Sequence, residues 1–169
     1  MANEPIENPV INSPFAEPQR HFRFSDAGIT NEIAPGRRKS VYFIPIARPK
    51  QRSSQLSLHY EPQNEARENR LINELREKVA PWRRAGYPGV SYTTRRLLEY
   101  WQRAGRERRL FFCQIEALET IIYLTELSRN ADLNYFENQL REANANATPE
   151  GHAPLARIAF KMATGSGKT

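Results

Sequence analysis

Residues 157–169, RIAFKMATGSGKT, restrict the possible folds of this sequence more than any other segment. From Arg157 to Met162, apolar side chains alternate with charged or small ones, which is typical of a short β-strand. Gly165–Thr169, GSGKT, follows almost directly. Glycines in such a turn let successive backbone N–H groups point inward at phosphate oxygens. The segment therefore predicts a strand that leads into a phosphate-binding loop.

In a loop of this kind the last two residues carry most of the chemistry. Lys168 is predicted to bind the β and γ phosphates as a positive charge, and the Thr169 hydroxyl to ligate Mg²⁺. ATP and Mg²⁺ are therefore the predicted cofactors. The remaining cofactor-binding residues are Thr164, Gly165, Ser166 and Gly167. The general pattern begins with glycine, whereas this sequence has Met162 at that position.

That departure is itself informative, because MATGSGKT resembles motif I of superfamily-two helicases and translocases. Within the DEAD/DEAH-like helicases it most resembles the nuclease-linked branch, including the Res subunits of type III restriction enzymes. It looks far less like the loop of a nucleotide kinase, a small GTPase or an ABC-type ATPase. A chance glycine-rich turn is the simplest alternative.

A second segment, LFFCQIEALETIIYLTEL, resembles the adenine-recognising region of these helicases, in which a Gln follows an aromatic residue and opens an amphipathic helix. The resemblance implies that Gln114 binds adenine, with Phe111 or Phe112 as a stacking partner. A carboxamide offers one donor and one acceptor side by side, which matches the N6 and N7 edge of adenine. The competing interpretation is that Gln114 only opens an exposed helix.

The resemblance implies a RecA-like α/β P-loop core and an ATP-dependent helicase or translocase subunit of a restriction endonuclease, a hydrolase. Its partners would be double-stranded DNA and a methyltransferase subunit of a restriction-modification system. Such an ATPase also needs a later acidic motif, whereas Glu116, Glu119 and Asp132 all precede the loop. We therefore expect an N-terminal fragment that has no catalytic residues of its own, binds nucleotide weakly, and neither hydrolyses ATP nor cleaves DNA.

Composition, apolar spacing and the resemblance together predict four regions. They are a disordered arm over 1–20, short strands and a linker over 21–55, a helical Arg-rich region over 56–110, and the beginning of a RecA-like ATPase domain over 111–169. As a whole the chain is predicted to be mostly α-helical with a few short strands, at residues 21–24 and 41–46. Helices are predicted over 64–82, 91–105, 114–129 and 132–143, the first ended by Pro81 and the second capped by Ser91, Thr93 or Thr94.

The charge is unevenly distributed. The chain carries 25 Lys and Arg against 19 Asp and Glu, and residues 81–110 hold eight arginines against two glutamates. Arginine matches phosphate oxygens well, so a nucleic-acid backbone is a plausible partner. The predicted DNA-binding residues are Arg95, Arg96, Arg106, Arg108 and Arg109. The alternatives are a stand-alone Arg-rich DNA-binding or adaptor module without ATPase activity, and a solvated face whose arginine stems cover apolar neighbours.

The only cysteine, Cys113, excludes an intramolecular disulfide and is typical of a reducing compartment. It is predicted to be a small buried hydrophobe. The sequence has no stretch of about 18 apolar residues and no signal-peptide layout at its start. A cytoplasmic protein with no membrane partner is therefore predicted.

Overall fold

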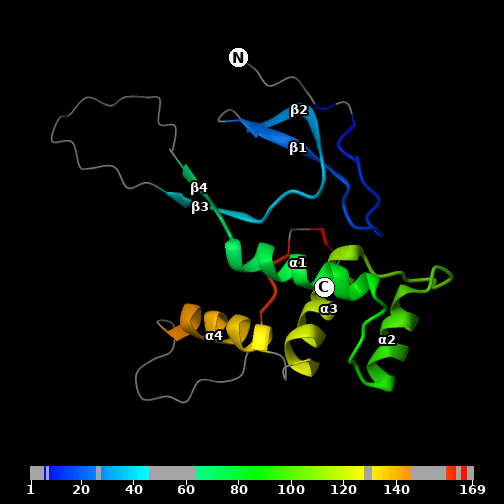
Figure 1. Ribbon diagram of the computed structural model, residues 1–169. Helices are drawn as coiled ribbons and strands as arrows, with labels where there is room; N and C mark the ends of the chain where they lie inside the picture. The colour runs from blue at the N-terminus through cyan, green and yellow to red at the C-terminus, as the bar shows by residue number, and fades with distance from the viewer. Residues whose placement is uncertain are drawn as a thin grey trace, which may run out of the picture.

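The computed structural model describes residue 6 and residues 8–25, 28–45, 64–127, 131–145, 159–162 and 165–166. These residues form a small mixed domain of four helices and two separate two-stranded antiparallel sheets (Figure 1). None of the helices in these ranges has the length and apolar character needed to cross a membrane.

The first sheet is a hairpin of β1 (Arg20–Ser25) and β2 (Gly28–Pro35), in which Ser25 pairs with Gly28 at the turn and Arg20 with Pro35 at the open end. The predicted strand at residues 21–24 is therefore confirmed. Beyond β2 the chain turns at Gly36, whose φ of +83° is a conformation that favours glycine. The Gly36 carbonyl oxygen lies 2.8 Å from His21 Nδ1, which ties the turn to β1.

The second sheet pairs β3 (Val41–Pro45) with β4 (Asn64–Glu68), so the predicted strand near residues 41–46 is also confirmed. Residues 64–68 were predicted to be helical, and that prediction is wrong. Their backbone groups pair with β3, and the ladder continues where Asn69 N–H donates to the Ser40 carbonyl at 2.9 Å. Pairing with a strand far away in sequence outweighs the helix propensity of this polar segment.

Helix α1 (Arg70–Arg84) runs through Pro81, which was predicted to end it. The proline removes one backbone donor, but it lies on the exposed side of the helix. Val79 and Trp82, which flank it, are 1% and 7% exposed, so burial of the apolar face holds the last turn in place. The helix ends instead at Ala85, whose N–H donates to the Pro81 carbonyl at 2.9 Å.

The other three helices lie close to their predicted positions: α2 (Tyr92–Gln102), α3 (Phe112–Glu126) and α4 (Ala131–Ala145). Of the three predicted caps of α2, Ser91 is the one used, since its Oγ accepts from Thr94 N–H at 3.3 Å. The Glu126 carboxylate on α3 accepts from Ser91 N–H and from Thr94 Oγ1, each at 3.1 Å. The start of α2 is thus bonded to the end of α3.

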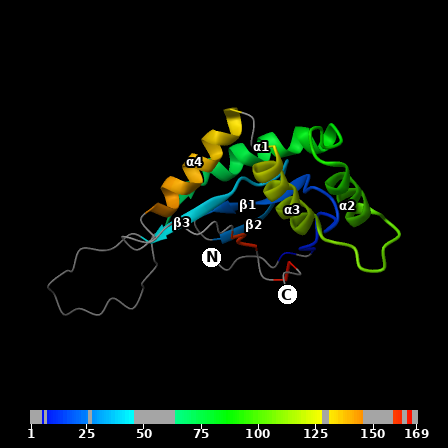
Figure 2. The ribbon, with the colours of Figure 1, turned by 90° about the horizontal axis from the view of Figure 1, so that it is seen from below.

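The hydrophobic core lies among the helices, as Figures 1 and 2 show: α3 and α4 pack on the side of α1 that faces away from the β1–β2 hairpin. Its buried members are Leu75, Val79, Trp82, Tyr87, Leu98 and Phe136. The Trp82 ring meets the rings of Tyr87 and Tyr123 edge to face, with centroids 5.0 and 5.3 Å apart. These contacts fix the angle between α1 and α3.

The N-terminal arm differs from its prediction. Residues 8–19, predicted to be disordered, contact the helices, while residues 1–5 and 7 lie outside the described residues. Asn12 folds the arm on itself, because its Oδ1 accepts from the backbone N–H groups of Gln19 at 3.0 Å and Arg20 at 3.1 Å. The Pro14 carbonyl then accepts from Phe112 N–H at 2.8 Å, which attaches the arm to the start of α3.

The strand predicted over residues 157–162 is not formed in the part that the structure describes. Residues 159–162 have no strand assignment, and residues 157 and 158 lie outside the described residues. Among the four, Met162 is half-buried and the others are exposed. A strand needs a neighbour for its backbone groups, and neither described sheet includes this segment.

Candidate nucleotide-binding site

Gln114, the residue expected to bind adenine, lies in the first turn of α3. Its Oε1 accepts a hydrogen bond from Phe111 N–H at 2.8 Å, which satisfies one of the backbone donors at this helix end. The Gln114 side chain is half-buried and has a further interaction within the protein. The capping interpretation therefore has direct structural support, and adenine binding stays a prediction.

The phosphate-loop string comes to the same helix end. Cys113 Sγ lies 3.8 Å from the carbonyl oxygen of Ser166, so the loop runs beside the residue that precedes Gln114. Cys113 is half-buried here, and this contact is more specific than the buried-hydrophobe role that was predicted for it. Two segments 53 positions apart are thus brought together at the N-terminus of α3.

The loop turns at Gly165, whose φ is +77°. A residue with a side chain is strained in this conformation, even though a Cβ at this position would meet no other atom within 4 Å. The glycine is therefore required by the backbone path and not by crowding. Of the other predicted cofactor-binding residues, Thr164, Gly167, Lys168 and Thr169 lie outside the described residues.

The two candidate stacking rings are already in contact with other side chains. Phe111 packs against Phe15 of the arm, with ring centroids 5.6 Å apart. Two guanidinium groups lie over the Phe112 ring. The Cζ atom of Arg83 is 4.9 Å from the ring centroid, and that of Arg37 is 5.5 Å from it. A base that stacked on Phe112 would compete with these cation–π contacts.

Two of the three acidic residues of α3 form ion pairs with arginines. Glu116 forms a two-pronged ion pair with Arg37, whose Nη2 donates to Glu116 Oε2 at 2.6 Å. Glu119 has no exposed surface and accepts from Arg83 Nε at 2.7 Å. Both carboxylates therefore hold the chain together from inside the domain.

Glu119 is also the centre of a buried hydrogen-bond chain. Tyr87 Oη donates to Glu119 Oε1 at 2.6 Å, and Gln102 Nε2 donates to Tyr87 Oη at 2.6 Å. Burial and the neighbouring Glu119 carboxylate raise the pKa of the Tyr87 phenol well above its ordinary value. Although burial opposes it, the hydrogen bond and charge of Glu119 raise the pKa of Arg83. The chain thus connects α1, α2 and α3.

A cavity of about 230 Å³ borders this network, between the arm, the end of α2 and α3. Arg83 and Glu119 line one part of it, and Phe15, Arg109 and Phe112 line another. Sequence reasoning missed the network because its members are scattered along the chain. The buried Glu119 follows the apolar Ile115 by one helical turn, and this was the one visible signal that the residue faces inward.

The five arginines predicted to bind DNA separate into two groups. Arg95, Arg96, Arg108 and Arg109 are exposed, whereas Arg106 is half-buried. Arg106 lies 4.7 Å from the centroid of the Tyr100 ring, and Arg109 lies 4.3 Å from that of Phe15. Arg95 donates to the Tyr87 carbonyl at 3.2 Å. Among these five, Arg96 and Arg108 make the fewest interactions with other residues in the described part of the chain.

Comparison with known proteins gave no match to this chain among family models, curated proteins or solved structures. The described residues contain no group of three or more His, Cys, Asp or Glu side chains arranged to hold a metal ion. A magnesium ion bound together with a nucleotide needs fewer protein ligands, because phosphates and water complete its coordination.

Proposed function

We propose that this chain belongs to an ATP-dependent DNA helicase or translocase subunit of the restriction type, with a RecA-like ATPase fold. ATP and Mg²⁺ are its proposed cofactors, and double-stranded DNA and a methyltransferase subunit its proposed partners. The string MATGSGKT is the sequence basis of this proposal. The contact of Cys113 with Ser166 is the single structural observation that supports it.

That contact matters because a nucleotide must touch both segments at once. The phosphates would lie on the loop around Ser166, and the base would lie near Gln114, one residue beyond Cys113. The left-handed φ of Gly165 is the kind of turn that aims backbone N–H groups at an anion. The helix end beside the loop adds a favourable dipole for negative charge.

The donor chemistry of the segment fits Mg-ATP. Lys168 would neutralise charge on the terminal phosphates, the Thr169 hydroxyl would ligate Mg²⁺, and the backbone from Thr164 to Gly167 would hold the phosphate oxygens. Bound Mg²⁺ would supply further neutralisation of phosphate charge. Gln114 would bind the base through its carboxamide, whose acceptor and donor match the N6 and N7 edge of adenine.

The coding sequence downstream of Thr169 gives the most direct test. A frame that continues into an apolar strand ending in Asp-Glu within about a hundred residues would support the proposal. A stop codon immediately after Thr169 at the natural locus, with no continuation in the adjacent frame, would contradict it. Because a Mg²⁺ motif would then be absent, no ATPase of this class would remain.

The alternative, an Arg-rich DNA-binding or adaptor module, is favoured by the exposure of Arg96 and Arg108 on α2 and the loop that follows it. Arg96 lies 5.7 Å from the ring centroid of Tyr92, which is itself 74% exposed. Duplex binding that is salt-sensitive and independent of nucleotide would favour this module. Binding unchanged in an Arg96→Gln/Arg108→Gln variant would remove its basis.

A further inference from the structure

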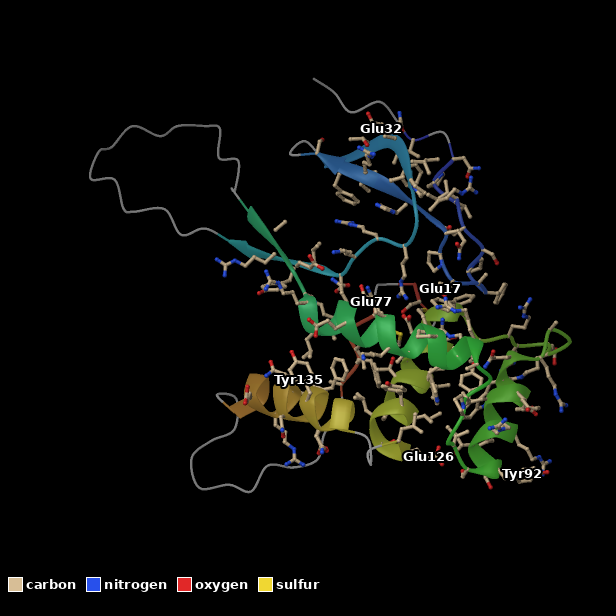
Figure 3. All side chains as sticks on the ribbon, in the orientation of Figure 1. Glu17, Glu32, Glu77, Tyr92, Glu126 and Tyr135 are labelled. Carbon is tan, nitrogen blue, oxygen red and sulfur yellow. The ribbon has the colours of Figure 1, made fainter. Side chains whose placement is uncertain are left out.

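A second group of cations lines a groove on the side of α1 that faces the β1–β2 hairpin. The groove holds about 310 Å³ and lies between α1 and the segment that joins the two sheets. We call it the basic groove; its cations are Arg37, Arg38, Lys39, Arg76 and Arg84. Figure 3 shows two other lining residues, Glu17 and Glu77, on the side of α1 that faces the hairpin, and Tyr92 at the far tip of α2.

We infer that the basic groove binds the phosphate backbone of a nucleic-acid duplex. This inference deepens the proposed function, since it rests on the proposed DNA partner. It adds a contact surface that is separate from the α2 arginines.

The basic groove has more positive than negative side chains. Two acidic residues, Glu17 and Glu77, face its five cations. Glu17 is already shared with Arg83, at 3.2 Å from Nη1. The groove therefore has a surplus of positive charge that its own residues do not neutralise, and its cations would release the counterions condensed on an arriving polyanion.

Three of the five cations have no carboxylate within salt-bridge distance among the described residues: Arg38, Arg76 and Arg84. The other two are paired, Arg37 with Glu116 and Lys39 with Glu68, whose carboxylate lies 3.0 Å from Nζ. Burial lowers the pKa of Arg76 and repulsion from Arg37 lowers it further, while the Glu116 carboxylate acts in the opposite direction. Like charges are thus held close together, and a bound phosphate relieves that repulsion.

The geometry suits an extended anion. Arg76, Ala80 and Arg84 are spaced four residues apart, so they share one face of α1, with a small side chain between the two arginines. A rise of 1.5 Å per residue separates Arg76 from Arg84 by about 12 Å along the helix, enough to meet about three successive phosphates of one strand. The Arg38 guanidinium, 3.7 Å from the Phe24 ring centroid, is held at the hairpin side.

The lining also favours a duplex over a single strand. Single strands are bound by stacking their bases on aromatic rings, and no aromatic residue lines the basic groove in the described part of the chain. Cations without stacking platforms contact the backbone and do not read bases. Binding is therefore expected to be independent of sequence.

The test is fluorescence anisotropy of the full 169-residue chain with a labelled 20-base-pair duplex, repeated with a second duplex sequence and one single strand. Arg76→Gln/Arg84→Gln should weaken duplex binding about tenfold at low salt and reduce the slope of log affinity against log salt by about 2. The matched control, Arg23→Gln/Arg141→Gln, removes the same charge from two exposed residues outside the groove and should bind as the parent does.

A second pair of variants guards against a folding defect. Ala80→Glu leaves every cation in place and adds a negative charge between Arg76 and Arg84, whereas Ala80→Gln adds the same bulk without charge. We expect the Glu variant to bind duplex at least about fivefold more weakly than the Gln variant. Equal affinities for the two would overturn the inference, and thermal unfolding would verify that both fold.

The remaining outcomes separate the inference from the proposed function. If Arg96→Gln/Arg108→Gln weakens binding but the groove variants do not, the inference fails and the DNA partner stands. If the parent chain binds no duplex, both fail. Binding of phosphatidylserine vesicles in place of duplex, lost in the same groove variants, would also overturn the inference.

Discussion

Arg83 of α1 donates its Nε–H to the carboxylate of Glu119 on α3 at 2.7 Å, and that carboxylate has no exposed surface. An ion pair in this position fixes the distance between two helices. Without Arg83 the buried Glu119 carboxylate would lose its counter-charge, and without Glu119 the Arg83 guanidinium would keep only the longer contacts to Glu17 and Glu116, at 3.2 and 3.8 Å. Glu119 also accepts from Tyr87, so the pair controls the packing of the segment between α1 and α2.

Glu119→Gln should therefore lower the free energy of unfolding by about 3 kcal/mol, measured by urea denaturation. Glu137→Gln, which breaks the exposed pair of Glu137 with Arg141, is the matched control and should change it by less than about 0.5 kcal/mol. Similar small effects of the two substitutions would show that Glu119 is not a structural anchor.

The Tyr87 phenol should ionise at a higher pH than an ordinary tyrosine. Burial and Glu119 raise its pKa above the ordinary 10.0, so the folded state favours the neutral phenol. This contribution to stability is complete below about pH 10 and is lost as the pH rises above it. In an absorbance titration of phenolate, Tyr87→Phe should remove a component whose midpoint lies above the ordinary range. Loss of an ordinary component instead would contradict the buried phenol.

The proximity of the loop to α3 can be tested by cross-linking. Ser166→Cys places a second thiol beside Cys113, and mild oxidation should give an intramolecular disulfide, detected as a loss of two hydrogens by mass spectrometry. Cys113→Ala/Ser166→Cys is the control and should remain reduced or form only dimers. Failure of the first variant to cross-link as a monomer would mean that the loop does not lie at this helix end.

Gln114→Glu separates the two roles of Gln114. A glutamate keeps the acceptor that caps α3, so the thermal midpoint should stay within about 2 °C of the parent. It lacks the N–H that would meet adenine N7, so in a protein extended by its downstream sequence the affinity for ATP should fall at least about tenfold. Unchanged ATP affinity would leave Gln114 with the capping role alone.

The arm offers a fifth test through Asn12. Asn12→Ala removes two acceptor contacts to the backbone of Gln19 and Arg20 and one donor contact to the Arg20 carbonyl at 2.8 Å. The arm should then detach from the helices, and trypsin should cut after Arg20 several times faster than in the parent. Ser13→Ala, at an exposed neighbouring position, should leave the cleavage rate unchanged.

Helix positions could be predicted from the sequence wherever apolar spacing was strong. The cap at Ser91 predicted α2 to within three residues at either end, and the stripe of Leu75 and Val79 predicted α1 but placed its start six residues too early. The β-strand Asn64–Glu68 could not be predicted, because its partner residues lie 19 to 27 positions away and its own residues are mostly polar. The prediction that α1 ends at Pro81 was wrong for a related reason. The burial that stabilises the last turn of the helix is a property of the packed core.

Around the candidate site, sequence reasoning identified the loop and Gln114 but not what surrounds them. Arg83 is one of eight arginines between residues 81 and 110, and this cluster suggested an external partner. The ion pair of Arg83 with Glu119 was therefore not predicted. An arginine that faces a buried carboxylate and one that faces solvent have the same local sequence signature. Only the fold distinguishes Arg83, which stabilises the interior, from Arg96, which is exposed.

The hydrogen bond from Phe112 to the Pro14 carbonyl has a consequence for biosynthesis. The arm leaves the ribosome before α3 does, so its docking surface does not exist until α3 has been translated. Closing so long a loop is entropically costly and slow relative to helix formation. During this interval Phe15 lacks its partner Phe111, so the nascent chain exposes an aromatic residue that a chaperone is suited to cover.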